Sequence, residues 1–254
     1  ASDSSWGCCH SHLKVDTVAL FALLMGQGDG KTIFVTGVNG HIGNHIVADL
    51  LSNGYNVKGS VRDLSDPNKV DHVIARAKKL DCEQRLQLVE GDVLDAECWT
   101  QHLIGCDGLF HTATIYATSG DGQLIIDTAN KGTDNVLKAA AEAGIKRVIY
   151  TSSVAAIGSE PKGKLKDHTC WQTNTSMPYV VAKTESERHA WKLAKQFDLD
   201  LRVINPSGVL GGGFTRPTPS TDIIGDALAG KFPMTIKIPM AFVHVKDVAI
   251  AHRR

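Results

Sequence analysis

Short apolar runs alternate with amphipathic stretches between about residues 31 and 206 of this 254-residue chain. Runs of valine and isoleucine without polar alternation are typical of parallel strands that helices cover on both faces. Stretches with apolar residues three or four positions apart predict helices. The pattern predicts strands at 32–36, 55–61, 86–93, 108–114, 147–153 and 201–206, and helices at 41–54, 70–80, 95–104, 124–144 and 177–198.

This alternation predicts an α/β fold with a doubly wound parallel sheet, the Rossmann fold, because successive βαβ crossovers are right-handed. We expect a dinucleotide-binding domain at 31–206. A Gly-, Pro- and Thr-rich stretch at 208–221 follows it, and we expect 207–254 to be the start of a small, C-terminally truncated substrate lobe. Residues 1–30 lack the pattern, and we expect them to be a leader outside the fold.

Composition excludes several classes of protein. The chain has 27 basic and 27 acidic residues, so its net charge gives no overall attraction to nucleic acid or anionic membranes. Its longest apolar run, at 18–25, is far shorter than the ~20 residues of a spanning helix. The six cysteines form no CxxC pair, which favours reduced thiols and a cytoplasmic protein. The CCHSH run at 8–12 has no second ligand pair, so we expect no metal site.

A glycine-rich turn, TGVNGHIG, follows the first predicted strand and precedes a predicted helix. Its glycines, Gly37, Gly40 and Gly43, are three residues apart. The first glycine permits a tight turn, the second admits a diphosphate to the backbone, and the third allows close packing of helix on strand. The free N–H groups and the dipole of the helix then attract the diphosphate. His41 and His45 have the spacing of a metal pair, but burial against a dinucleotide or solvent exposure is favoured for both.

Tyr179 and Lys183 lie four residues apart on a predicted helix, so their side chains share one face. A phenol with a pKa of about 10 is a poor acid or base near neutrality. A neighbouring ammonium group favours the phenolate and lowers that pKa. Ser153 or Ser152, at the end of the fifth strand, would complete such a site, since strand alternation lets only one of them face it.

The end of the second strand indicates which nucleotide binds. NAD sites place an acidic residue there, about 20 residues beyond the glycines, to bind the ribose 2′-hydroxyl. This chain has Val61 and Arg62 instead. An arginine can hold a 2′-phosphate through two parallel hydrogen bonds, so the sequence favours NADP. The alternative is that Arg62 is a solvated surface residue.

Further motifs follow in order: HTAT at 111–114, NKGTDNVLKAA at 130–140, TSS at 151–153, YVVAK at 179–183, NPSGVLG at 205–211 and FVHVKDVA at 242–249. With the glycine turn, they resemble the extended short-chain dehydrogenase/reductase superfamily, its NAD(P)-dependent epimerase/dehydratase branch, and most closely the dihydroflavonol reductase-type carbonyl reductases. This resemblance favours Ser153, which would hydrogen-bond the substrate oxygen while Tyr179 exchanges a proton with it. It also implies that Lys183 binds the nicotinamide ribose.

The resemblance assigns the cofactor contacts as well. Lys69 would be a second contact to the 2′-phosphate, and Asp92 would accept a hydrogen bond from the adenine amino group. Asn135 and Asn130 are weaker candidates for a proton relay. The expected cofactor-binding residues are Gly37, Gly40, His41, Ile42, Gly43, Arg62, Lys69, Asp92, Val93, Thr112, Ala113, Lys183, Pro206 and Val209.

These observations predict an NADP-dependent oxidoreductase that transfers a hydride between NADPH and a small aldehyde or ketone. One alternative is an NAD-dependent sugar-nucleotide epimerase or dehydratase, which shares the Ser–Tyr–Lys set but which Arg62 argues against. Another is a non-catalytic nucleotide-sensing Rossmann protein, a class that usually lacks the Tyr–Lys pair. We expect no nucleic-acid or membrane partner, and a homodimer is compatible with the sequence.

Overall fold

The central element is a six-stranded parallel sheet in the order β3-β2-β1-β4-β5-β6. The computed structural model describes residues 28, 30–114, 121–158, 165–173, 175–214, 216, 218–232 and 240–254. The strands are β1 (Thr32–Thr36), β2 (Asn56–Val61), β3 (Leu86–Glu90), β4 (Gly108–His111), β5 (Arg147–Thr151) and β6 (Asp200–Ile204). This order reverses between β1 and β4, as in doubly wound folds, and confirms the predicted fold class.

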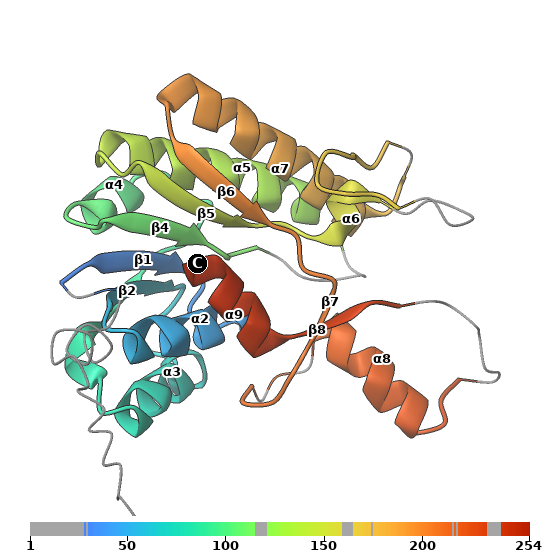
Figure 1. Ribbon diagram of the computed structural model, residues 1–254, viewed down its shortest axis with the longest axis horizontal. Helices are drawn as coiled ribbons and strands as arrows, with labels where there is room; N and C mark the ends of the chain where they lie inside the picture. The colour runs from blue at the N-terminus through green and yellow to red at the C-terminus, as the bar shows by residue number, and fades with distance from the viewer. Residues whose placement is uncertain are drawn as a thin grey trace, which may run out of the picture.

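Helices cover both faces of the sheet (Figure 1). One layer contains α4 (Trp99–Leu103), α5 (Gly122–Glu142) and α7 (Pro178–Phe197); the other contains α2 (His41–Ser52), α3 (Pro67–Lys79) and α9 (Val245–Arg253). Each layer buries its own apolar core. Phe34 packs in the first core and its neighbour Val35 in the second, because successive strand residues point to opposite faces.

Element boundaries differ from the predicted ones where local hydrogen bonds decide them. Helix α3 begins three residues earlier than predicted, because Asp66 caps it by accepting from the Asn68 N–H and Pro67 occupies its first turn. Strand β4 ends at His111, since the next two N–H groups turn to the Thr36 hydroxyl instead of a neighbouring strand. Between residues 31 and 206, two short elements were not predicted, namely η1 (Glu83–Arg85) and α6 (Val154–Ile157).

The last part of the chain forms β7 (Gly208–Leu210), α8 (Pro219–Leu228) and β8 (Phe242–His244), with β7 and β8 paired in parallel. These elements lie beside the main sheet, whereas α9 returns to pack against α2 (Figure 1). Val209, Val245 and Val248 are buried together against Ile42 of α2. The division expected at residue 206 remains a prediction, and the expected leader lies almost entirely outside the described residues.

Three features of the described residues bear on function. No helix within them is both long enough and apolar enough to span a membrane. They contain no cluster of three or more side chains suited to hold a metal ion. Their four cysteines, Cys82, Cys98, Cys106 and Cys170, are free thiols. The CCHSH run at 8–12 lies outside the described residues.

An ion pair joins the last helix, α9, to α2. The Arg253 Nε donates to Asp49 Oδ2 at 2.6 Å, and the two side chains are only 9% and 16% exposed. A charge-assisted hydrogen bond that is shielded from water contributes more to stability than an exposed ion pair. The pair therefore anchors the last helix to the helix that opens with the glycine turn.

We expect Asp49→Asn to lower the free energy of unfolding by about 1.5–3 kcal/mol, because the neutral amide loses the charge-assisted hydrogen bond from the Arg253 guanidinium. Urea denaturation followed by circular dichroism measures this change as a lower midpoint at an unchanged slope. The control is Asp71→Asn, which alters an exposed residue of α3. Equal midpoints for the two variants would show that the pair does not anchor α9.

Candidate active site

The turn between β1 and α2 requires glycine at two positions, Gly37 and Gly43. Gly37 has φ +67°, a conformation that favours glycine, and a Cβ on Gly43 would lie 2.3 Å from the Gly37 carbonyl oxygen. Helix α2 can therefore lie directly against the end of β1. This is the close approach that the spacing of the glycines predicted.

The first turn of α2 fits a diphosphate. Its N-cap, Gly40, offers no side-chain acceptor, whereas Asp121 and Thr218 cap α5 and α8 with side-chain oxygens. The first backbone N–H groups of α2 thus meet no capping side chain, and they carry the positive end of the helix dipole. Gly40 and Gly43 keep this surface bare. The residues present match a dinucleotide phosphate site.

The glycine loop that follows β7 is docked onto α2 and α3. The imidazole of His41 donates to the Gly211 carbonyl at 3.2 Å, and that of His45 donates to Gly212 at 2.9 Å. Arg76 donates to the Gly213 carbonyl at 2.6 Å and to Nδ1 of His45 at 3.2 Å. Burial, then the Arg76 charge, lowers the pKa of His45 to about 4, so the ring stays neutral. The His41 and His45 side chains thus hold this loop, and the contact expected of His41 with the cofactor remains a prediction.

Thr36 joins the ends of β1 and β4. Its hydroxyl oxygen accepts from the N–H groups of Thr112 at 2.9 Å and Ala113 at 3.0 Å. Both lone pairs are then in use, so its hydrogen goes to Nδ1 of His111 at 2.9 Å. Burial and, secondarily, the Lys183 charge lower the pKa of His111 to about 3. His111 is therefore neutral, with its proton on Nε2.

Lys183 is a buried cation at the carboxyl end of the sheet. Its side chain comes from α7, and Nζ donates to the carbonyl oxygen of Thr151, the last residue of β5, at 3.0 Å. The residue is 5% exposed. Burial lowers the pKa of Lys183 to about 8, while the negative charge of Glu187 acts in the opposite direction. Such a perturbed cation at a strand end is typical of a functional site.

Glu187 lies one turn beyond Lys183 on α7 and is also buried, at 5% exposure. The Asn205 amide donates to its Oε2 at 2.8 Å and to the Ser153 carbonyl at 3.1 Å. The Trp191 Nε1 donates to its Oε1 at 3.4 Å. The carboxylate is thus fixed by neutral donors, and its charge remains available to stabilise the Lys183 ammonium.

The two candidate serines differ in their contacts. Ser153 caps α6, and its oxygen accepts from the Ala155 N–H at 3.2 Å, which leaves its hydroxyl hydrogen free to donate. The Ser152 hydroxyl is buried and has no partner among the described residues. Ser153 lies two residues beyond the carbonyl that binds Lys183, and Tyr179 lies half-buried one turn before Lys183. Ser153, Tyr179 and Lys183 remain the predicted catalytic set.

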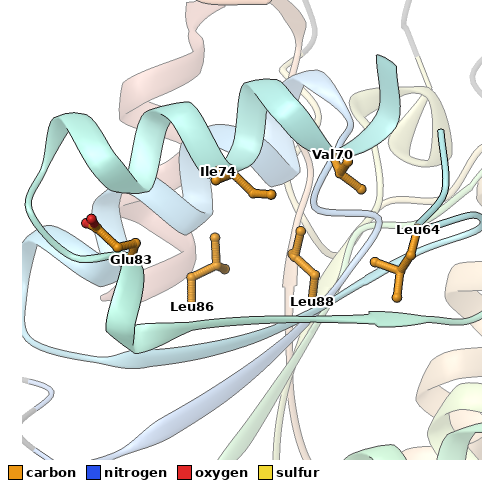
Figure 2. Close-up of a pocket in the computed structure, with 6 residues that line it drawn as sticks. All are labelled: Leu64, Val70, Ile74, Glu83, Leu86 and Leu88. Carbon is orange, nitrogen blue, oxygen red and sulfur yellow. The ribbon is translucent and has the colours of Figure 1, made fainter. Parts of the chain in front are cut away.

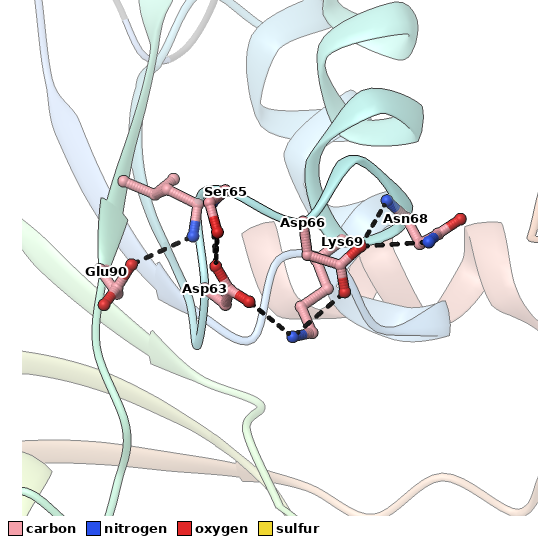
Figure 3. Close-up of polar contacts among 7 residues, drawn as sticks. Asp63, Ser65, Asp66, Asn68, Lys69 and Glu90 are labelled. Carbon is pink, nitrogen blue, oxygen red and sulfur yellow. Dashed lines mark hydrogen bonds and ion pairs between the residues drawn. The ribbon is translucent and has the colours of Figure 1, made fainter.

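Arg62 lies in the loop after β2, and Lys69 lies in the first turn of α3. Arg62 is exposed, directly after the last residue of β2. Lys69 bridges Asp63 at 3.3 Å and Asp66 at 3.2 Å, as Figure 3 shows. Asp63 lies beyond the end of β2 at Val61, in the segment that leads into α3. A phosphate contact by Lys69 would compete with these two carboxylates.

The remaining predicted cofactor residues lie in three different settings. Asp92, Thr112, Ala113 and Pro206 follow the ends of β3, β4 and β6. Ile42 and Val209 pack together in the small core under β7. Val93 is buried, and its carbonyl accepts from Asn135 at 2.9 Å. Asn130 donates to Glu185 at 3.1 Å, so both candidate relay asparagines are engaged elsewhere.

An apolar pocket of about 320 Å³ lies between α3 and β3. Figure 2 shows its wall of leucine, valine and isoleucine side chains, with Glu83 at one end. Its lining residues are Leu64, Val70, Ile74, Glu83, Leu86 and Leu88. None of the predicted catalytic residues lines it, so it is separate from the site at the strand ends.

The model of the NAD dependent epimerase/dehydratase family matches residues 33–254. The chain belongs to this family. Its fold and motifs place it in the extended short-chain dehydrogenase/reductase superfamily, as the sequence predicted.

Named relatives include a cinnamoyl-CoA reductase 1 of Petunia hybrida, 36% identical over 90% of this chain and 69% of that protein. A putative dihydroflavonol 4-reductase of a Synechocystis strain is 33% identical over 86% of this chain and 61% of that protein. The chain thus spans about two thirds of these relatives' length. Gre2 from Candida albicans in complex with NADPH is 27% identical with a TM-score of 0.71, covering 88% of this chain and 73% of Gre2.

Sequence reasoning missed several groups that shape the site. Glu187 was detectable, since it repeats the four-residue spacing of Tyr179 and Lys183 on the same helix. The loop contacts of His45 and Arg76 join segments about 140–170 residues apart, and no local pattern indicates them.

We expect Glu187→Gln to lower the pKa of Lys183 below about 8, because glutamine keeps an oxygen for Asn205 but removes the charge that stabilises the ammonium. A ¹³C NMR titration of the lysine Cε signal, assigned with Lys183→Arg, measures it. Glu185→Gln, on the exposed side of α7, is the control and should leave that titration unchanged. A higher or unchanged pKa in Glu187→Gln would contradict the assignment.

Proposed function

We propose that this protein is an NADP-dependent oxidoreductase that reduces a small aldehyde or ketone to the alcohol. The observation that carries the proposal is the buried Lys183, which lies one turn from Tyr179 and binds the Thr151 carbonyl, two residues before Ser153. The named relatives are reductases, which supports the same class of reaction.

In the proposed reaction, Tyr179 donates its phenolic proton to the substrate oxygen as the carbonyl carbon is reduced. Bound NADPH supplies the hydride. The Lys183 ammonium lowers the pKa of the phenol and stabilises the phenolate that remains. The Ser153 hydroxyl donates a hydrogen bond to the same substrate oxygen, with its orientation fixed by the Ala155 N–H.

Chain residues also account for the choice of NADP. The backbone N–H groups at the start of α2 would hold the diphosphate, and the Arg62 guanidinium would bind the 2′-phosphate. Arg62 is exposed at the end of β2, where an NAD site has an acidic residue. The NADPH complex of the related Gre2 supports this choice.

The predictions about location, assembly and partners belong to this proposal. A cytoplasmic location is consistent with four free cysteines in the described residues. A homodimer and the lack of a nucleic-acid partner remain predictions. The sugar-nucleotide alternative would need NAD, so cofactor preference separates it from the proposed reductase. The non-catalytic alternative predicts cofactor binding without turnover of any carbonyl compound.

We expect Tyr179→Phe to lower turnover of a responsive aldehyde or ketone by about 10²–10⁴-fold, the usual contribution of general acid–base catalysis. NADPH affinity should stay close to that of the wild type, because the phenolic oxygen acts on the substrate. Steady-state rates and fluorescence titration with NADPH measure the two quantities. Tyr55→Phe, at the opposite end of the sheet, is the control. A Tyr179→Phe variant that keeps more than about a tenth of the wild-type rate would refute the role of this tyrosine.

We expect Arg62→Ala to weaken NADPH binding far more than NADH binding. Only NADPH carries the 2′-phosphate, and hydrogen bonds to a charged group contribute about 1.5–3 kcal/mol. Titrations of the intrinsic fluorescence of both nucleotides give the two losses. Arg202→Ala, an exposed arginine of β6, should change neither. Equal losses for NADPH and NADH would make Arg62 a structural residue and reopen the choice of cofactor.

A further inference from the structure

His252 is a buried titratable residue with no part in the reaction proposed above. It lies on the last turn of α9 and is 1% exposed. Its Nδ1 lies 2.7 Å from the Val248 carbonyl oxygen, and its Nε2 lies 2.8 Å from the Thr151 hydroxyl. Both ring nitrogens are therefore engaged, on opposite sides of the ring.

These contacts determine where the proton of His252 lies. A carbonyl oxygen can only accept, so Nδ1 carries the hydrogen and donates it to Val248. Burial lowers the pKa of His252 to about 4, so the ring is neutral and Nε2 has a free lone pair. The Thr151 hydroxyl must therefore donate to Nε2.

Thr151 connects this histidine to the lysine. While its hydroxyl donates to His252, its carbonyl oxygen accepts from Lys183 Nζ at 3.0 Å. One residue at the end of β5 thus makes both contacts, and all three residues are buried. Helix α9 itself is anchored to α2 by the Arg253–Asp49 pair.

We propose that His252 is a positioning residue for Lys183, which acts through Thr151 by fixing the end of β5. The neutral imidazole holds the Thr151 side chain, and the backbone carbonyl of the same residue then points steadily at the lysine. The role in turnover rests on the proposed function. The charged and titratable groups that face Lys183 are Glu187 and Tyr179 on α7 and His111 at the end of β4.

Two substitutions at His252 separate positioning from simple packing. Glutamine places an amide oxygen near the position of Nε2, so His252→Gln keeps an acceptor for the Thr151 hydroxyl. Asparagine places its amide near the position of Nδ1, so His252→Asn keeps a donor for Val248 but loses the contact with Thr151. Both variants lose the ring, and both should lose similar thermal stability.

We expect His252→Asn to lower kcat about tenfold and to shift the upper limb of its pH profile to lower pH. A less ordered carbonyl acceptor favours the ammonium less, so the pKa of Lys183 falls. His252→Gln should stay within about twofold of the wild type in kcat, with an unshifted profile. Equal losses in the two variants, or a reduced kcat with an unshifted profile in His252→Asn, would overturn the proposal.

A second pair of variants covers the case in which His252→Asn does not fold. Thr151→Ser keeps the hydroxyl and should match the wild type, whereas Thr151→Val keeps the shape without the hydroxyl and should behave as His252→Asn is expected to. If all four variants fold, combining Thr151→Val with His252→Asn should add little to either alone, because both break one contact. Fully additive effects would show that the two residues act separately.

The ¹³C titration of Lys183 keeps this test independent of the proposed function. If the wild type reduces no aldehyde or ketone, the proposed function fails, but the pKa of Lys183 can still be compared among the variants. A lower pKa in His252→Asn and Thr151→Val, with no change in His252→Gln and Thr151→Ser, supports the positioning role. The same pKa in all four variants overturns it.

Discussion

The close approach of α2 to the end of β1 is the constraint on which the site depends. A Cβ on Gly43 would lie 2.3 Å from the Gly37 carbonyl, so only a bare backbone allows the helix to begin there. That position points the first N–H groups of α2 past the ends of β1 and β4, where the strand order reverses. It also presents His41 and His45 to the glycine loop that follows β7. The proposed phosphate site and the packing of the C-terminal segment thus follow from one steric requirement.

The carboxyl end of the sheet contains several buried ionisable groups whose charges burial suppresses. His111 and His252 are neutral rings. Thr36 determines which nitrogen of His111 carries the proton, and Thr151 and the Val248 carbonyl determine it for His252. Lys183 is the exception, because Glu187 partly restores the charge that burial disfavours. Neutral neighbours keep competing charges away from Lys183, which suits the role that we propose for it beside Tyr179.

The C-terminal segment takes part in the site instead of only covering it. Its loop at 211–213 binds α2 and α3 through backbone carbonyls, and α9 contacts both Asp49 of α2 and Thr151 of β5. The C-terminal elements and α2 are therefore mechanically connected. A displacement of either one should shift the position of Lys183, since closely packed buried contacts transmit small displacements.

Periodicity and motif order predicted the strands of the main sheet, the helices α2, α3, α4, α5 and α7 and the turn at Gly37–Gly43, because these depend on local patterning and on steric rules that act within a few residues. The same holds for Tyr179 and Lys183, whose shared face follows from helical geometry. The predicted ends of the helices and strands were less accurate. Hydrogen bonds to side chains such as those of Asp66 and Thr36 decide where α3 begins and where β4 ends. Only the tertiary structure decided that Thr151 binds Lys183 with its carbonyl and His252 with its hydroxyl. Those contacts join residues 32 and 101 positions apart, and no local sequence pattern constrains the geometry of groups that meet only after the chain has folded.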